Sequence, residues 1–170
     1  LILQNSVGSF SWSKLDQVGF HHGGAAADID NDGDIDVFVA GHHPFFYINN
    51  GKANFKRVDD RFDHSINQVY NAELIDVDRD GFVDLLAGGH EHEGDQTSIY
   101  WGNSAGTYTN ADRTIIQGLS GYGVVLDFAS EDLNGDNKKD LIINRTGGGN
   151  SNFYEGSKIQ ILINNGGREF

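Results

Sequence analysis

Asp28-Ile-Asp-Asn-Asp-Gly-Asp-Ile-Asp36 is the first of three copies of one nine-residue pattern; the others are Asp76-Val-Asp-Arg-Asp-Gly-Phe-Val-Asp84 and Asp132-Leu-Asn-Gly-Asp-Asn-Lys-Lys-Asp140. The first two copies follow Asp-x-Asp-x-Asp-Gly-x-x-Asp, and the third has Asn134 and Asn137 at positions 3 and 6. Carboxylates packed this closely repel each other, and a hard divalent cation relieves the repulsion. The pattern therefore predicts three calcium loops.

Calcium takes about six to eight oxygen ligands in a flexible cage. We expect side-chain oxygens from loop positions 1, 3, 5 and 9 and a backbone carbonyl from position 7. The expected ligands are Asp28, Asp30, Asp32, Asp34 and Asp36; Asp76, Asp78, Asp80, Phe82 and Asp84; and Asp132, Asn134, Asp136, Lys138 and Asp140. Position 6 must turn sharply, which favours Gly33, Gly81 and, in the third loop, Asn137. The alternative is an acidic turn without an ion, and it is strongest for the third loop.

The pattern does not continue as an EF-hand. An EF-hand loop ends with glutamate at position 12 and leads into a helix. Position 12 here is Val39, Ala87 and Ile143, inside short apolar runs that are typical of buried strands. Each loop is therefore expected between two strands.

A second motif follows each loop and also stands at the start of the chain: an apolar residue, a turn rich in Asn, Gly and Ser, and an aromatic residue seven positions on. Its copies start at Leu3, Ile48, Trp101 and Ile163 and end at Phe10, Phe55, Tyr108 and Phe170. The motif is typical of a β-hairpin. Several strands in each repeat of roughly 40–50 residues indicate propeller blades.

We therefore predict an all-β chain of blades with four antiparallel strands, about three blades plus an extra N-terminal hairpin. The inner strand consists of small residues, as in Gly24–Ala27, and runs into the loop. The second strand leaves the loop, and the third and fourth strands form the hairpin. The expected divisions of this single repeat domain are an outer hairpin at 1–15 and blades at 16–62, 63–114 and 115–170. The run Arg145–Ser157 is expected to be a long, mobile surface loop.

These motifs resemble the FG-GAP/VCBS repeats of integrin α-chains and many secreted microbial proteins, over nearly the whole chain. The element that names the family is only loosely present, around Gly19–Ala25. The resemblance implies a propeller with calcium loops on one face and recognition by the opposite face, without implying one ligand. Three blades and a hairpin do not close a ring. We therefore expect a segment of a longer protein, or a subunit completed by its neighbours.

The net charge of −13 argues against nucleic acid and anionic membrane as partners. The three loops hold 12 of the acids, and three calcium ions would bring the charge to −7. No apolar run is long enough for a transmembrane helix. No nucleophile triad, phosphate loop or cysteine-based metal motif is present, so we expect a protein that is not an enzyme.

The redox compartment cannot be inferred, because the chain has no cysteine. Calcium loops of weak to moderate affinity fill where calcium is millimolar, which favours an extracellular or cell-surface location. Asn144-Arg-Thr146 is a glycosylation sequon, a triplet that also occurs often by chance.

Histidines gather where the blade pattern predicts the rim opposite the calcium loops. They are His21, His22, His42, His43, His90 and His92. One interpretation is a ligand or transition-metal site, with His90-Glu-His92-Glu as its most suggestive part. The other is a set of exposed polar loop residues. Several aromatic residues near the same connections suit either sugar stacking or core packing: Phe20, Phe45, Phe46, Tyr70, Tyr122, Phe153 and Tyr154.

Three functions remain open from the sequence. The first is a non-catalytic, calcium-stabilised module for extracellular recognition or adhesion, with a glycan or protein ligand. The second is a self-assembling subunit of a fibre or surface layer. The third is an accessory domain of a secreted polysaccharide-active enzyme.

Overall fold

The computed structural model describes residues 2–4, 7–12, 19–66, 68–118 and 121–170. These residues form three antiparallel sheets and a separate hairpin. The first blade contains β3 (His21–Ala27), β4 (Asp36–Gly41), β5 (Phe45–Asn49) and β6 (Phe55–Val58). The second contains β7 (Val69–Ile75), β8 (Asp84–Gly89), β9 (Thr97–Tyr100) and β10 (Arg113–Ile116), and the third contains β11 (Tyr122–Glu131), β12 (Asp140–Gly147) and β13 (Gln160–Leu162). Short helical turns lie at η1 (Glu91–Glu93) and α1 (Gly149–Asn152), and β1 (Ile2–Gln4) pairs with β2 (Phe10–Trp12).

Each acidic loop connects the first two strands of its blade, as predicted. The strands pair up to the loop itself, with Ala27 opposite Asp36, Ile75 opposite Asp84 and Glu131 opposite Asp140. Strand order then follows chain order outward in every sheet. All three acidic loops therefore occupy the same place in their blades.

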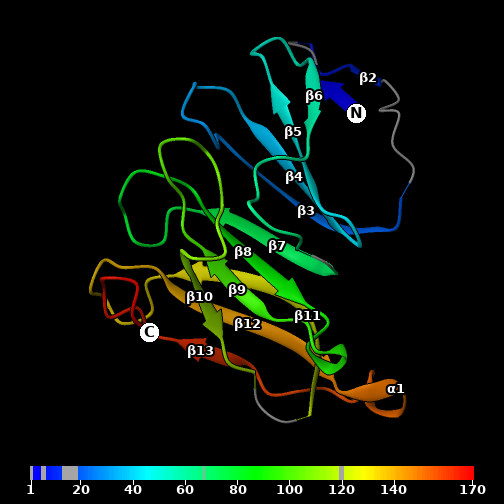
Figure 1. The fold of residues 1–170 in the computed structure, drawn as a ribbon, viewed down its shortest axis with the longest axis vertical. Helices are drawn as coiled ribbons and strands as arrows, with labels where there is room; N and C mark the ends of the chain where they lie inside the picture. Colours follow the sequence, from blue (N-terminus) through cyan, green and yellow to red (C-terminus); the bar gives the residue numbers. More distant parts are fainter. Residues whose placement is uncertain (1, 5–6, 13–18, 67, 119–120) are drawn as a thin grey trace.

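The inner strands lie beside one another, β3 next to β7 and β7 next to β11. Figure 1 shows the blades following one another along the long axis, with the first at the top. Small residues permit this approach. A Cβ added at Gly23 would lie 3.1 Å from the carbonyl oxygen of Tyr70, and one at Gly88 would lie 2.6 Å from the Cβ of Val125.

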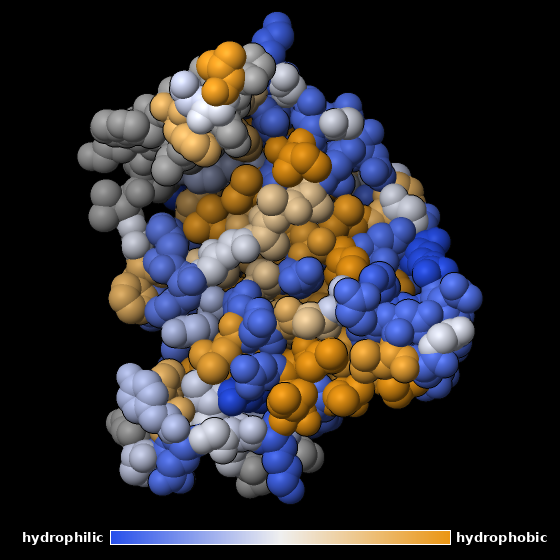
Figure 2. All heavy atoms as spheres, turned by 180° about the vertical axis from the view of Figure 1, so that it is seen from behind, coloured by the Kyte–Doolittle hydropathy of each residue, from blue (hydrophilic) through white to orange (hydrophobic). Residues whose placement is uncertain are grey.

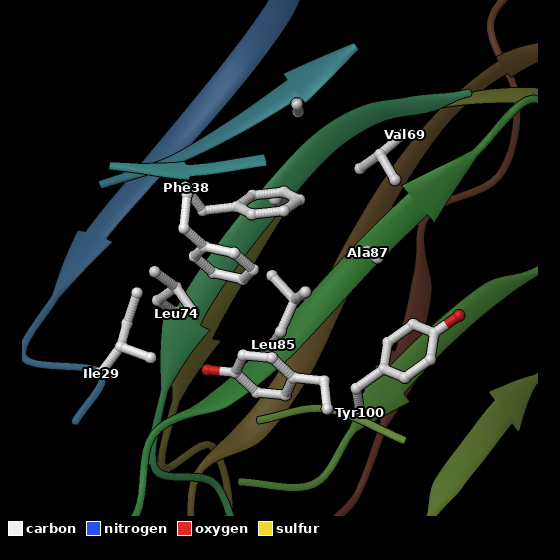
Figure 3. Packing of buried hydrophobic residues seen from close by; sticks show 11 residues of the cluster. Ile29, Phe38, Val69, Leu74, Leu85, Ala87 and Tyr100 are labelled. Carbon is white, nitrogen blue, oxygen red and sulfur yellow. The ribbon is translucent and has the colours of Figure 1, made fainter. Parts of the chain in front are cut away.

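Two apolar clusters join the blades. Between the first and second, Phe38 points toward Leu74 and Leu85 (Figure 3). Between the second and third, Leu86 and Ile99 pack with Val125, Phe128 and other buried residues. Burial of these side chains, worth about 1.5–3 kcal/mol each, makes the blades a stack with shared cores.

The hairpin motif of the second blade was expected to place Tyr108 on the fourth strand, and this expectation is wrong. Strand β10 begins at Arg113, while Tyr108 forms a bridge to Phe62. The ring of Tyr108 stacks on Phe46 at 5.7 Å, and its hydroxyl donates a hydrogen bond to the carbonyl of Val83 at 3.0 Å. Packing between blades has therefore displaced the aromatic residue from the strand.

The third blade differs from the four-strand expectation, since its described part has three strands. After β13, the chain makes a tight turn in which Gly166 bridges Glu169, and Phe170 packs on the second core. The N-terminal hairpin forms as expected between Ile2–Gln4 and Phe10–Trp12, although part of the predicted 1–15 unit lies outside the described residues.

The run Arg145–Ser157 is not simply a surface loop. Strand β12 continues to Gly147 and the short α1 follows it. Arg145 is 1% exposed, because its guanidinium meets an acidic partner from the second blade.

Apolar residues also reach the surface, and Figure 2 shows them gathered across the middle of one face with hydrophilic residues along its margin. Exposed aliphatic side chains include Ile159, Ile161 and Ile163 around β13. Within the described ranges, helices are too short and too polar to cross a bilayer.

Candidate functional site

The acidic loops fold around the aspartate at position 1. Asp28 accepts hydrogen bonds from the backbone N–H groups of Asp32 and Gly33, at 3.1 and 2.9 Å. Asp76 accepts one from Gly81 at 3.0 Å, and Asp132 accepts one from Asn137 at 2.8 Å. The loops thus share one side-chain-to-backbone framework.

The left-handed turn expected at position 6 is confirmed, with φ values of 92° at Gly33 and Gly81 and 66° at Asn137. Position 4 is left-handed as well, at Asn31 (57°), Arg79 (64°) and Gly135 (81°). This second turn was not predicted from the sequence, although asparagine and glycine in two copies were a signal for it.

Position 5 orients position 7 in every copy. The side chains of Asp32, Asp80 and Asp136 accept hydrogen bonds from the N–H groups of Asp34, Phe82 and Lys138, each at 2.9 Å. The expected use of the three position-7 carbonyls stays a prediction.

The aspartate at position 9 is fully buried in all three copies: Asp36, Asp84 and Asp140. One oxygen of each accepts a hydrogen bond from the position-2 N–H, at 3.2, 2.8 and 2.9 Å respectively. The other oxygen accepts one at 2.8 Å from a backbone N–H at or just after the end of the third strand, at Asn49, Gly102 and Asn164. Position 9 therefore fastens the loop to the third strand, a role that the sequence analysis did not foresee.

Burial also changes the protonation of Asp36 and Asp84. It raises the pKa of Asp36, and it raises the pKa of Asp84 to about 7 against the two backbone hydrogen bonds that favour the ionised form. Nearby loop carboxylates add to both shifts. A bound cation would reverse this balance, because it stabilises the ionised form.

Carboxylate oxygens converge in two of the loops. One oxygen each from Asp28, Asp30 and Asp32 lies within 4.8 Å of the others, and the same holds for Asp76, Asp78 and Asp84. Buried oxygens, Oδ1 of Asp30 and Oδ1 of Asp76, have no hydrogen-bond partner. Unpaired buried oxygens beside other carboxylates fit a hard cation as their missing partner.

Each loop also has a basic neighbour, and only the lysines of the third loop were evident from the sequence. Arg61 contacts Asp30 at 2.8 Å, and Lys138 pairs with Asp136, which lowers the pKa of that carboxyl. Arg168 reaches from the turn after β13 to Asp78 at 2.6 Å and to Asp80 at 3.3 Å. These side chains partly neutralise the loops.

The rim opposite the loops carries the predicted histidines. His42 follows β4 and His90 follows β8, as expected from the blade pattern. His21 and His22 were expected before the inner strand but are its first residues. The ring of His22 stacks on Tyr70 at 4.2 Å and lies 6.2 Å from that of His90.

The histidines do not form one group. The His21 ring packs against Phe45 at 5.6 Å, and His43 is exposed. His22 and His90 are partly buried, which lowers the pKa of each. His22, His90 and His92 form a subset whose rings lie near one another, with centroids 6.2 Å apart for His22 and His90 and 5.8 Å apart for His90 and His92.

A polar cleft of about 510 Å³ lies next to this subset, between the second and third blades. It is lined by Glu91, His92, Thr97, Gln117, Tyr122 and neighbouring residues. The Tyr122 hydroxyl is buried without a hydrogen-bond partner.

Beside the cleft, Arg145 donates hydrogen bonds to both carboxylate oxygens of Glu91, at 2.8 and 3.0 Å. Its guanidinium lies 4.7 Å above the Tyr122 ring and also donates to Gln160 at 2.6 Å. The sequence offered little signal for this pair, since its members are 54 residues apart and Arg145 precedes a glycine run.

The aromatic residues divide between core and surface. Phe45, Phe46 and Tyr122 are buried, whereas Phe20 and Tyr154 are exposed. Asn144, the sequon residue, has an exposed position on β12.

The stacked antiparallel sheets, two with four described strands and one with three, and their acidic loops define a propeller-type repeat module. The FG-GAP-like repeat family matches residues 28–87 and again residues 76–143, each match running from one acidic loop into the strand that follows the next. The chain belongs to the FG-GAP-like repeat family. A comparison with curated proteins gave no significant match.

Proposed function

We propose that this chain is a non-catalytic, calcium-stabilised propeller module for extracellular recognition. The observation that carries the calcium part is the convergence of loop carboxylates around buried oxygens that lack a partner. Calcium would be held by positions 1, 3 and 5 of each loop, with the buried position-9 aspartate and the position-7 carbonyl beside them. The third loop is the weakest candidate, because Asn134 replaces a carboxylate and Lys138 pairs with Asp136.

Calcium would act on stability, because an ion that binds only the folded state adds RT ln(1 + [Ca]/Kd) at each site. At 100 times Kd this is about 2.7 kcal/mol per site. Asp76→Asn preserves the size of a proposed ligand and removes its charge. We expect it to lower Tm in millimolar calcium and to change Tm much less in chelator.

Asp60→Asn is the matched control, since Asp60 is an exposed acid outside the loops. Equal losses in calcium and chelator for Asp76→Asn would contradict a role in ion binding. Calorimetric titration supplies the affinity, and a Kd of about 10⁻⁴–10⁻³ M would suit an extracellular module. A Kd in the submicromolar range would instead fit a cytosolic protein.

The recognition part rests on the polar cleft at the opposite rim. Its side chains offer amide, hydroxyl and carboxylate groups around the unpaired Tyr122 hydroxyl, which suits a glycan or a polar protein segment. Binding to an array of neutral and acidic glycans in calcium tests the glycan arm. Gln117→Ala, at an exposed lining residue, should abolish a specific signal that Asp60→Asn retains. If no glycan on the array binds, a polar protein segment remains the expected ligand of the cleft.

Self-assembly is the second candidate, favoured by one observation. Strand β13 is the outermost described strand of its sheet and pairs only with β12. Ile159 and Ile161 beside and within it are 62% and 55% exposed. Such an edge can pair with another chain. Light scattering in calcium should then show a larger particle that Ile161→Lys dissociates, whereas a monomeric wild-type chain would contradict this candidate.

A further inference from the structure

A compact group of nitrogen and oxygen ligands lies far from the acidic loops, at the turn that follows β8. His90 Nδ1 is 3.7 Å from Glu93 Oε2, and His92 Nε2 is 3.5 Å from Glu93 Oε1. One ligand atom from each of the three residues lies within 4.8 Å of the others. Neighbouring ligands of a tetrahedral zinc ion at 2.0–2.1 Å are separated by about 3.3–3.4 Å. The two imidazole–carboxylate separations are within a few tenths of an ångström of that value.

In both histidines, the ring nitrogen that lies near Glu93 can offer a lone pair to a metal ion. His92 Nδ1 lies 3.3 Å from the carbonyl oxygen of Gly123 and, as the donor of that hydrogen bond, leaves the Nε2 lone pair toward Glu93. This is the outer contact that orients metal-bound histidines in proteins. His90 Nδ1 is buried and has no hydrogen-bond partner. Two imidazole nitrogens therefore lie beside one carboxylate, His90 Nδ1 near Oε2 and His92 Nε2 near Oε1.

The backbone holds this arrangement in place. His90 bridges Val124 of the third blade, and its carbonyl accepts a hydrogen bond from the N–H of Glu93 at 2.9 Å. Gly94 then closes the turn with a left-handed φ of 97°. Neighbouring rings also hold the His90 ring in place. Its centroid lies 5.4 Å from that of Tyr70 and 5.8 Å from that of His92, on which it stacks. Little rearrangement is needed to bring three ligands onto one ion.

We infer that His90, His92 and Glu93 bind one zinc ion, with a coordination position left open beside the polar cleft that His92 lines. Imidazole nitrogen suits zinc, whereas calcium takes oxygen ligands. This site therefore differs in chemistry from the acidic loops and does not depend on their binding calcium. An open position on zinc can accept a ligand atom such as a carboxylate or imidazole.

The test is a calorimetric titration of the tag-free full chain with zinc chloride, in excess calcium so that the acidic loops are occupied by the competing ion. We expect one zinc per chain, with an affinity that calcium leaves unchanged. His92→Gln and Glu93→Gln should each weaken it at least about tenfold, while His43→Gln, at an exposed histidine, should not. Circular dichroism verifies that each variant is folded.

A second readout is independent of heat changes. Cobalt in place of zinc should give the visible absorption of a tetrahedral site in the wild-type chain and in His43→Gln, and should lose it in His92→Gln. Absence of saturable zinc binding in calcium would overturn the inference. Equal weakening by His43→Gln and His92→Gln would overturn it too, since it would show adventitious binding to surface histidines.

Discussion

The ion pair between Arg145 and Glu91 makes a sharp prediction about how the second and third blades hold together. The Arg145 side chain is 0% exposed and that of Glu91 is 11% exposed, so water solvates neither charge well. Glu91→Gln keeps the side-chain volume but leaves the guanidinium buried without a counter-charge. Removing one partner of a buried pair costs about 3–5 kcal/mol. For a chain of this size that corresponds to a fall in Tm of roughly 6–20 °C.

Urea unfolding in calcium, followed by the fluorescence of the buried Trp101, measures this loss. The control is the pair of Lys139 and Glu131, whose side chains are 37% and 72% exposed. Glu131→Gln should cost no more than about 1 kcal/mol. In the double variant Glu91→Gln with Arg145→Met, the loss should be smaller than the sum of the single losses, because no lone buried charge remains.

The reasoning would be refuted by a loss for Glu91→Gln that is as small as that for Glu131→Gln. It would also be refuted by additive single and double variants, which would mean that the two side chains act separately. Either result would mean that the ion pair does not stabilise the packing of the second blade against the third.

Three further predictions concern blade contact, loop charge and pH. Gly88→Ala should cost about 1–3 kcal/mol in urea unfolding, because the added Cβ would meet Val125 at 2.6 Å, whereas Gly156→Ala should be nearly neutral in its open surroundings. Arg168→Gln should raise the calcium affinity of the middle loop, measured by calorimetry, because it removes a competing positive charge. A lower affinity would instead mean that the guanidinium holds the loop in its binding conformation. Burial raises the pKa of Asp84 from 3.8 to about 7, so the folded state retains a proton that the unfolded chain releases. Without calcium, the free energy of unfolding should therefore fall as pH rises from about 4 to about 7, and Asp84→Asn should flatten that slope.

The sequence predicted the features that depend on neighbouring residues. The acidic loops, their left-handed turn at Gly33 and Gly81, and the small inner strand at Gly24–Ala27 follow from spacing within a few positions. The family resemblance and the all-β fold are confirmed by the repeat matches and the sheets. Local patterns were sufficient because each blade repeats the same short-range connections.

Features that depend on distant residues could not be predicted in this way. Tyr108 leaves its expected strand because Phe46 and Phe62, from the first blade and the segment after it, offer a stacking surface. Arg145 is buried because Glu91 arrives from another blade. The position-9 aspartates had a visible partner motif after the third strand, but only the structure connected the two. Calcium, the ligand and the location stay predictions.

The acidic loops are joined in series by side chains that cross from one blade to the next. Asn31 of the first loop donates to the carbonyl of Gly81 in the second at 3.3 Å, and Asn164 of the third blade donates to the carbonyl of Val77 at 3.2 Å. An ion that rigidifies one loop would thereby lower the entropy cost of ordering its neighbour. Occupancy should then spread along the row as in a one-dimensional chain of coupled sites. The rim would change from compliant to stiff over a narrower calcium range than three independent loops would allow.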